Sequence, residues 1–169
     1  FYAYISTSDS ITGTLFSSGN VWQTTITDTT TLAAGTDYYL HIWGIDFSDG
    51  YEYAGFLGEF SLDGATHVFA NGTGSLLTNA TDWQGNTTGF NGTYGALVGL
   101  GTNGVAPWGT RTGVSASAEW IWTSGFSDPG ENNAYFTTKI TSVPDSGITL
   151  TLLGLGLAGL AFGRRFLKA

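Results

Sequence analysis

The sequence lacks two residue types entirely: none of its 169 residues is cysteine or methionine. Without cysteine the chain cannot form disulfide bonds, so cysteine usage allows an extracellular location but does not demonstrate one. The first residue is Phe1, and no methionine is present to serve as an initiator. We therefore expect that a secretory signal peptide preceded this sequence and was removed.

Basic residues are also scarce. In residues 1–143, Arg111 and Lys139 are the only bases against twelve acidic residues, which gives this part a formal charge of −10. A surface of this sign repels the phosphates of nucleic acids, so we expect no nucleic-acid partner. The same charge is compatible with an extracellular location or with cation binding.

Charged residues make up only 11% of the chain, whereas 41% of the residues are hydrophobic and 15% are aromatic. This composition argues against intrinsic disorder and supplies large side chains for a core. Residues 1–142 have the length of one domain.

Short alternating runs of Thr, Val, Ile and aromatic residues, separated by Gly, Asn-Gly and Asp-Gly, predict an all-β domain. Residues 37–47 and 51–62 alternate on either side of Ser48-Asp49-Gly50, which predicts a hairpin. Eight or more short strands without a helical period predict a β-sandwich of the jelly-roll type. The other strands are expected at residues 1–7, 12–16, 21–27, 66–70, 114–122 and 134–142.

Residues 85–110 contain eight of the 26 glycines. A stretch of this kind is either a flexible loop or a lobe that packs on the domain. Six large side chains favour packing for part of it: Phe90, Tyr94, Leu97, Val98, Leu100 and Trp108.

The C-terminus predicts a short transmembrane-type helix. Residues 148–163 are sixteen residues without a charge, and as a helix they would be about 24 Å long, against about 30 Å for a hydrocarbon core. Arg164, Arg165 and Lys168 follow, and they are expected to stay on the cytoplasmic side. A buried core helix is the alternative.

Five residues precede this helix: Val143, Pro144, Asp145, Ser146 and Gly147. Together with the Gly-rich apolar helix and the pair Arg164-Arg165, they resemble the C-terminal sorting signal of PEP-CTERM proteins in its Val-Pro-Asp-Ser-Gly variant.

The resemblance implies export, transient membrane anchoring and recognition by an exosortase, an intramembrane enzyme of exopolysaccharide-producing Gram-negative bacteria. We therefore divide the chain into an exported domain, residues 1–142, and a sorting signal, residues 143–169. The location implied is the cell surface or the extracellular space.

Small residues in the expected helix suggest a further role for it. Gly154 and Ala158, and likewise Gly159 and Gly163, are spaced so that two helices could approach closely. We expect the tails to pack in a homo-oligomer or filament. Alternatively, the glycines make the helix pliable for a membrane protease.

Three carboxylates lie in and beside the turn at residues 48–50: Asp46, Asp49 and Glu52. Flexible groups of oxygens suit Ca²⁺, although this spacing is not that of an EF-hand. The alternative is a solvated turn rich in Asp and Gly. We predict no other cofactor.

The six tryptophans include four that could serve as a sugar platform or as core: Trp83, Trp108, Trp120 and Trp122. The stretch Glu119-Trp120-Ile121-Trp122 resembles a segment of some jelly-roll carbohydrate-binding modules. Trp120 and Trp122, however, share a strand face with small apolar residues, which is typical of a core.

Four Asn-x-Thr sequences are candidates for glycosylation, although they also arise by chance in a chain of this composition. Their asparagines are Asn71, Asn79, Asn86 and Asn91.

No catalytic motif is present, and His41 and His67, the only histidines, both lie in strand patterns. A Ser-His-Asp site remains open because its members need not be near one another in sequence. We interpret each histidine as a hydrogen-bonded strand residue and predict no catalytic residues.

Two functional classes remain. The first is a non-catalytic structural protein of the cell surface or extracellular matrix that associates with itself. The second is a glycan-binding module that ties cells to exopolysaccharide.

Overall fold

The computed structural model of the chain describes residues 1–46, 53–125 and 132–144. The expected helix at residues 148–163 and most of the sorting signal lie outside these ranges. Within them, no helix is long and apolar enough to span a membrane.

The described residues form ten strands and no α-helix, which confirms the predicted all-β class. The strands are β1 (Tyr2–Ser6), β2 (Thr14–Ser18), β3 (Tyr38–Ile45), β4 (Glu59–Ser61), β5 (His67–Phe69), β6 (Ser75–Leu77), β7 (Gln84–Asn86), β8 (Val98–Thr102), β9 (Glu119–Trp122) and β10 (Asn133–Ser142).

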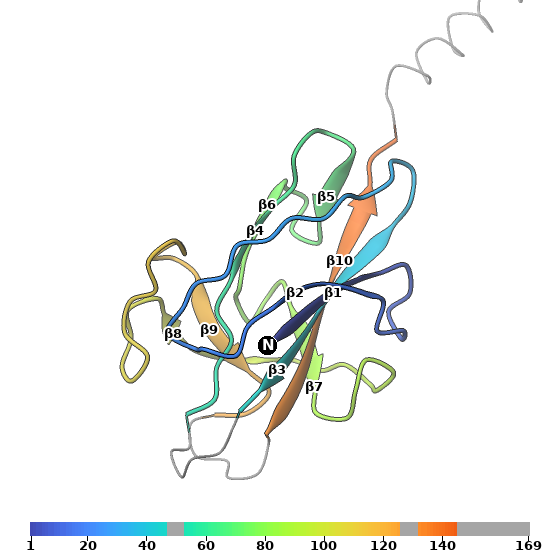
Figure 1. Cartoon of the computed structure of the whole chain (residues 1–169). Coiled ribbons are helices and arrows are strands. Elements are labelled where there is room, and N and C mark those ends of the chain that lie inside the picture. The colour runs from blue at the N-terminus through green and yellow to red at the C-terminus, as the bar shows by residue number, and fades with distance from the viewer. Residues whose placement is uncertain (47–52, 126–131, 145–169) are drawn as a thin grey trace, which may run out of the picture.

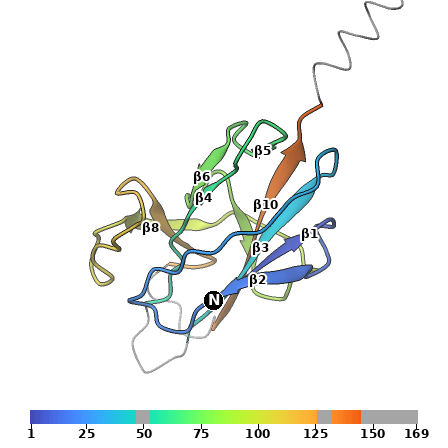
Figure 2. The ribbon, with the colours of Figure 1, turned by 45° about the horizontal axis from the view of Figure 1, so that its top comes forward.

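One six-stranded antiparallel sheet dominates the fold (Figure 1). Its order is β2-β1-β3-β10-β5, and β7 also pairs with β10. Two smaller antiparallel sheets, β4–β6 and β8–β9, form the rest. Figure 2 shows β2, β1, β3 and β10 side by side, with β2 outermost.

The core lies between the large sheet and the two smaller ones. Leu40 and Ile42 on β3 and Phe136 on β10 alternate inward, and all three are buried. The Phe136 ring packs edge-on against Trp122 of β9, with ring centroids 5.6 Å apart. Gly44 makes room for this contact, since a Cβ there would lie 2.8 Å from the Trp122 ring.

The predicted hairpin between residues 37–47 and 51–62 is wrong. β3 pairs with β1 on one side and β10 on the other, so no edge is left for residues 51–62. Phe56 instead forms a bridge with Ile121 of β9, and among residues 53–62, which the structure describes, only β4 is a strand, paired with β6. Gly55 fits under Trp108, where a Cβ would lie 2.9 Å from the indole.

Two other expected strands differ from the structure. Residues 21–27 form a turn and extended chain, and residues 114–118 precede β9 as turns. The second layer is accordingly two separate two-stranded sheets and not one continuous sheet.

The Gly-rich stretch 85–110 packs on the domain. Phe90, Leu97, Leu100 and Trp108 are all buried, whereas Val98 is exposed. These side chains anchor the stretch although its backbone is rich in glycine.

We predict that Phe136→Ala destabilises the domain by about 3–5 kcal/mol, because it leaves a cavity between the layers. Denaturant unfolding measures the change. Val98→Ala on exposed β8 is the control and should cost well under 1 kcal/mol. Equal effects of the two substitutions would contradict the position of the core.

Candidate functional site

The outer face of the large sheet carries a row of aromatic rings. Tyr2 of β1, Trp43 of β3 and Tyr135 of β10 are register partners. The Trp43 ring stacks on Tyr2 at 5.2 Å and on Tyr135 at 5.9 Å, measured between centroids. Trp43 Nε1 donates a hydrogen bond of 2.9 Å to Asn133 Oδ1. The rings therefore cover much of one another's faces and form a rigid, partly exposed row.

A shallow, open groove of about 490 Å³ adjoins this row. Asn86 of β7 is the register partner of Tyr135 and lies in the groove wall. The lining carries no charged residue; it consists of Gly85, Asn86, Thr87, Thr88, Thr93, Gly95, Ala96 and Thr123. Hydroxyl and amide groups of this kind suit a neutral, hydroxyl-bearing ligand.

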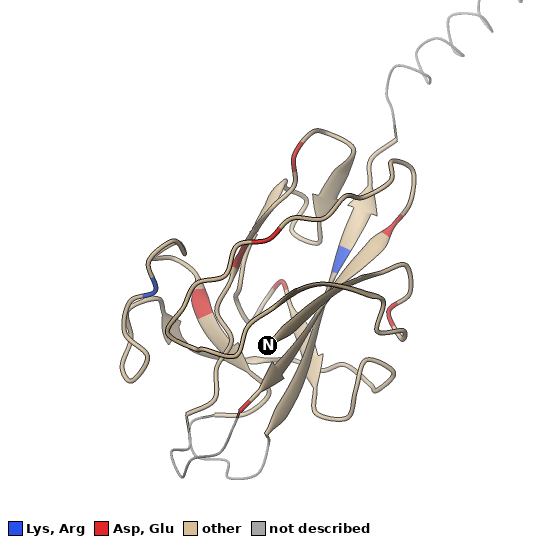
Figure 3. Cartoon of the chain, viewed as in Figure 1, with Lys and Arg blue, Asp and Glu red and all other residues tan. Residues whose placement is uncertain are grey.

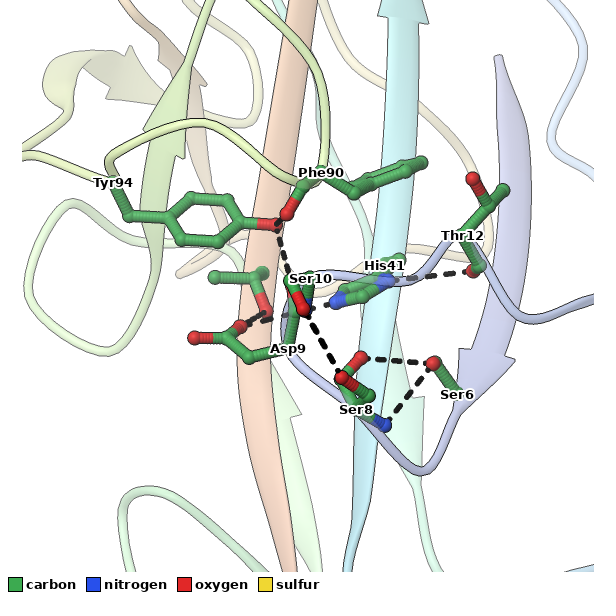
Figure 4. Close-up of polar contacts among 9 residues, drawn as sticks. Ser6, Ser8, Asp9, Ser10, Thr12, His41, Phe90 and Tyr94 are labelled. Carbon is green, nitrogen blue, oxygen red and sulfur yellow. Dashed lines mark hydrogen bonds and ion pairs between the residues drawn. The ribbon is translucent and has the colours of Figure 1, made fainter.

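His41 is fully buried on the same outer face, under the turn that joins β1 to β2 (Figure 4). Its ring stacks on Phe90, with centroids 4.5 Å apart. Nδ1 lies 3.3 Å from the carbonyl oxygen of Thr12, so Nδ1 carries the proton. Nε2 lies 3.9 Å from Asp9 Oδ1 and has no hydrogen-bond partner among the described residues.

Burial lowers the pKa of His41, although the Thr12 carbonyl and the Asp9 carboxylate favour the imidazolium. Asp9 is half-exposed and accepts a hydrogen bond of 3.2 Å from Thr137 Oγ1. Tyr94 donates to the carbonyl oxygens of Asp9 and Phe90, each at 3.1 Å. Burial raises the pKa of Tyr94, and Asp9 adds to that effect.

The serines near this histidine bond to one another or to backbone. Ser8 Oγ and Ser10 Oγ are 3.2 Å apart, and Ser6 Oγ donates to the carbonyl of Ser8. Within the described ranges, no hydrogen bond joins a serine hydroxyl to His41. The cluster therefore holds the β1–β2 turn on the sheet. The strand pattern in the sequence could not reveal that His41 Nε2 has no hydrogen-bond partner among the described residues.

His67 has partners on both ring nitrogens, as the sequence predicted. Nε2 lies 3.0 Å from the carbonyl oxygen of Thr36, and Nδ1 lies 3.0 Å from Thr66 Oγ1. It ties the chain before β3 to β5.

The four tryptophans proposed as a sugar platform are all buried. Their relative exposures are 1% for Trp83, 7% for Trp108, 5% for Trp120 and 4% for Trp122. Trp108 and Trp120 stack on each other at 4.7 Å. A sugar ring needs an exposed aromatic face, which none of these four offers. Of the two interpretations, the structure supports core.

Trp22 is the exposed tryptophan, at 59%. The guanidinium of Arg111 lies 4.6 Å from its ring centroid and 5.9 Å from that of Trp120. Arg111 also donates to the carbonyl of Trp108. This cation–π stack fastens the long connection between β2 and β3 to the β8–β9 lobe.

Three of the four Asn-x-Thr sequences form the same turn. The Oδ1 atoms of Asn71, Asn79 and Asn86 accept the backbone N–H two residues later, at 3.0, 2.8 and 2.8 Å. Asn79 Nδ2 also donates to Asp82, and Asn86 Nδ2 is buried. These asparagines have a structural use as turn formers, and glycosylation of any of the four, including exposed Asn91, stays a prediction.

The acidic turn is described only at Asp46, whose backbone N–H donates to the carbonyl of Asn132 at 2.9 Å. Asp49 and Glu52 lie outside the described residues. In the part of the chain that the structure covers, no three His, Asp or Glu side chains gather as a metal site. Calcium binding therefore stays a prediction.

β10 ends at Ser142, two residues before the end of the described chain. The backbone N–H of Val143 donates to the carbonyl of Thr66 at 2.8 Å, and Pro144 is the last described residue. A match to the VPDSG-CTERM motif covers residues 142–166. The chain carries a VPDSG-CTERM sorting signal. This signal, a variant of the PEP-CTERM type, marks an exported, surface-associated protein that exosortase-type machinery processes.

No curated protein and no solved structure matches the chain. The expected roles of Gly154, Ala158, Gly159 and Gly163 in helix packing fall outside the described residues, as do Arg164 and Arg165.

We predict that replacing Arg164 and Arg165 by Ala impairs sorting, because the basic end of the VPDSG-CTERM signal is lost. Cell fractionation and immunoblotting should show accumulation of unprocessed protein. Lys139→Ala, a basic residue outside the signal, is the control. Unchanged processing of the double variant would contradict this role.

We predict that acid destabilises the domain through His41. Its folded pKa lies below the ordinary value of 6.5, so the unfolded state takes up the proton first as the pH falls. This contribution to stability is fully present above pH 6.5 and is lost below it, at a limiting slope of about 1.4 kcal/mol per pH unit.

Denaturant unfolding between pH 7 and pH 5 measures this loss. His41→Gln should flatten the dependence. Asp9→Asn should steepen it, because the carboxylate that favours the imidazolium is removed. An unchanged profile in both variants would refute the assignment to His41.

Proposed function

We propose that this chain is a non-catalytic structural protein of the cell surface whose copies associate into an ordered assembly. The VPDSG-CTERM signal delivers it to the surface. Its β domain then serves as building material there.

The use of the domain's reactive and aromatic side chains supports this proposal. His41 lies stacked beneath Phe90, and His67 joins β5 to the chain before β3. The tryptophans of β9 fill the core between the sheets. Histidines and tryptophans often serve in catalysis or ligand binding, but here they hold the fold together, which is consistent with a structural protein.

Glycan binding is the second candidate, and a different place on the domain favours it. The row Tyr2–Trp43–Tyr135 leads to the uncharged groove beside Asn86. A neutral exopolysaccharide could lie along the row and place hydroxyls in the groove. Calcium bound by Asp46, Asp49 and Glu52 would belong to this alternative.

One comparison separates the two candidates. We expect electron micrographs of the purified full chain to show regular assemblies, and a glycan array with and without Ca²⁺ to show no binding. Dispersed particles that bind a glycan would overturn the structural role. Loss of binding in Tyr135→Ala would then place the glycan on the outer face.

In cells, deleting the gene should remove ordered material from the surface. A surface layer that is unchanged in thickness and regularity would contradict the proposal.

A further inference from the structure

Exposed apolar side chains are concentrated in one segment of the chain. Of the nine large hydrophobic residues that are exposed in the described ranges, five fall in residues 11–26: Ile11, Leu15, Val21, Trp22 and Ile26. This segment contains β2 and its flanks.

β2 is the outer strand of the large sheet, and in the described chain it pairs only with β1 (Figure 2). The opposite side of the sheet is partly covered. Gly85 of β7 exchanges two hydrogen bonds with Gly95, and Phe69 of β5 donates to Thr73 in its own following turn. β2, with five residues, is therefore the longer of the two strands at which the sheet ends, since β5 has three.

Backbone groups on β2 point away from the sheet. Phe1 and Gly19 exchange two backbone hydrogen bonds. The backbone N–H and C=O groups of Phe1, and of every second residue after it on β1, therefore face β2. Tyr2 and Tyr4 therefore face β3, which leaves the N–H and C=O groups of their partners, Ser18 and Leu15, directed outward. Such groups are a template for another strand.

The edge is also uncharged. No Lys, Arg, Asp or Glu occurs in residues 10–27, although the domain as a whole is strongly acidic. Figure 3 shows the acidic residues on other elements and turns. Two acids flank this range in sequence: Asp9 accepts a hydrogen bond of 3.2 Å from Thr137 Oγ1, and Asp28 accepts one of 2.7 Å from Ser17 Oγ. Two acidic copies can thus approach at this edge without placing like charges in the contact.

We propose that β2 pairs with β2 of a second copy, antiparallel and about a two-fold axis. An antiparallel edge is complementary to itself, so the same backbone groups and the same apolar side chains serve both copies. The inference rests on the proposed structural function and names the contact through which copies associate. A β2–β2 contact uses the β2 edge of both copies and gives a closed pair, so any longer assembly needs a second contact.

A charged side chain introduced on β2 tests the proposed pair. The full chain in detergent is studied by light scattering, in a Gly159→Leu background that weakens association through the tail. We expect a dimer, which Leu15→Lys converts to a monomer, halving the protein mass. Val98→Lys, at another exposed hydrophobic residue, should leave the dimer intact. A monomer before substitution, or a dimer that survives Leu15→Lys, would overturn the proposal.

The absence of cysteine allows a second test. Leu15→Cys and Ser18→Cys each place a single thiol on β2, and an antiparallel two-fold pair brings the thiol that lies nearer the axis close to its own copy. Mild oxidation should yield a covalent dimer from at least one of them, and Val98→Cys should stay monomeric. Equal cross-linking at all three sites would indicate random collision and overturn the pair.

The two proposals fail separately. If the purified chain is monomeric while cells that express it carry an ordered surface layer, the β2 pair alone is refuted. If the purified chain is dimeric but deletion of its gene leaves the cell surface unchanged, the structural function alone is refuted.

Discussion

The antiparallel pairing of β3 with β10 is the interaction on which the rest of the domain depends. Eight consecutive residue pairs join the two strands, and every other strand of the large sheet pairs with one of them or with β1. Their inward residues, such as Ile42 and Phe136, meet the second layer. The sorting signal follows β10 directly, so a central strand of the sheet connects the domain to the signal.

Both faces of this pair use aromatic contacts where other exported domains use disulfides. Inside, Phe136 packs against Trp122 and Phe56. Outside, Trp43 stacks on Tyr2 and Tyr135 and links three strands. Aromatic pairs contribute about 0.5–1.5 kcal/mol each beyond the area they bury, so such a network can stabilise a chain that has no cysteine. The small second layer, with its two short sheets, depends on this packing.

Alternation along the chain was enough to predict the all-β class and the approximate positions of β1, β3, β5 and β10. It could not predict partners, because a central strand and a hairpin strand alternate alike. The stretch 51–62 shows the difference: its alternation is real, but residues 53–62 pack between the layers, with Gly55 where the rings of Trp108 and Trp120 approach. The apolar alternation at residues 21–27 similarly reflects a segment held by the Trp22–Arg111 stack and not by a ladder.

The candidate sites show the same division. The sorting signal was predictable because it is a contiguous motif, read without any fold. The outer aromatic row and the His41 cluster were not, since each joins residues from separate strands and loops. Three of the four Asn-x-Thr sequences form a turn that uses the asparagine side chain, and a glycosylation motif requires the same residue, so the sequence could not separate the two roles.

The sorting signal affects how readily the β2 edge could meet a second copy, because it determines where copies of the protein are concentrated. The β2 edge is five residues long, and the register shift opposite Ala3 and Tyr4 leaves Phe16 of β2 as an extra residue, so β2 itself is bulged. Copies delivered to one surface meet at a high effective concentration, which strengthens a contact between them without new interactions. The proposed β2 pair is therefore favoured most where copies delivered by the sorting signal are concentrated.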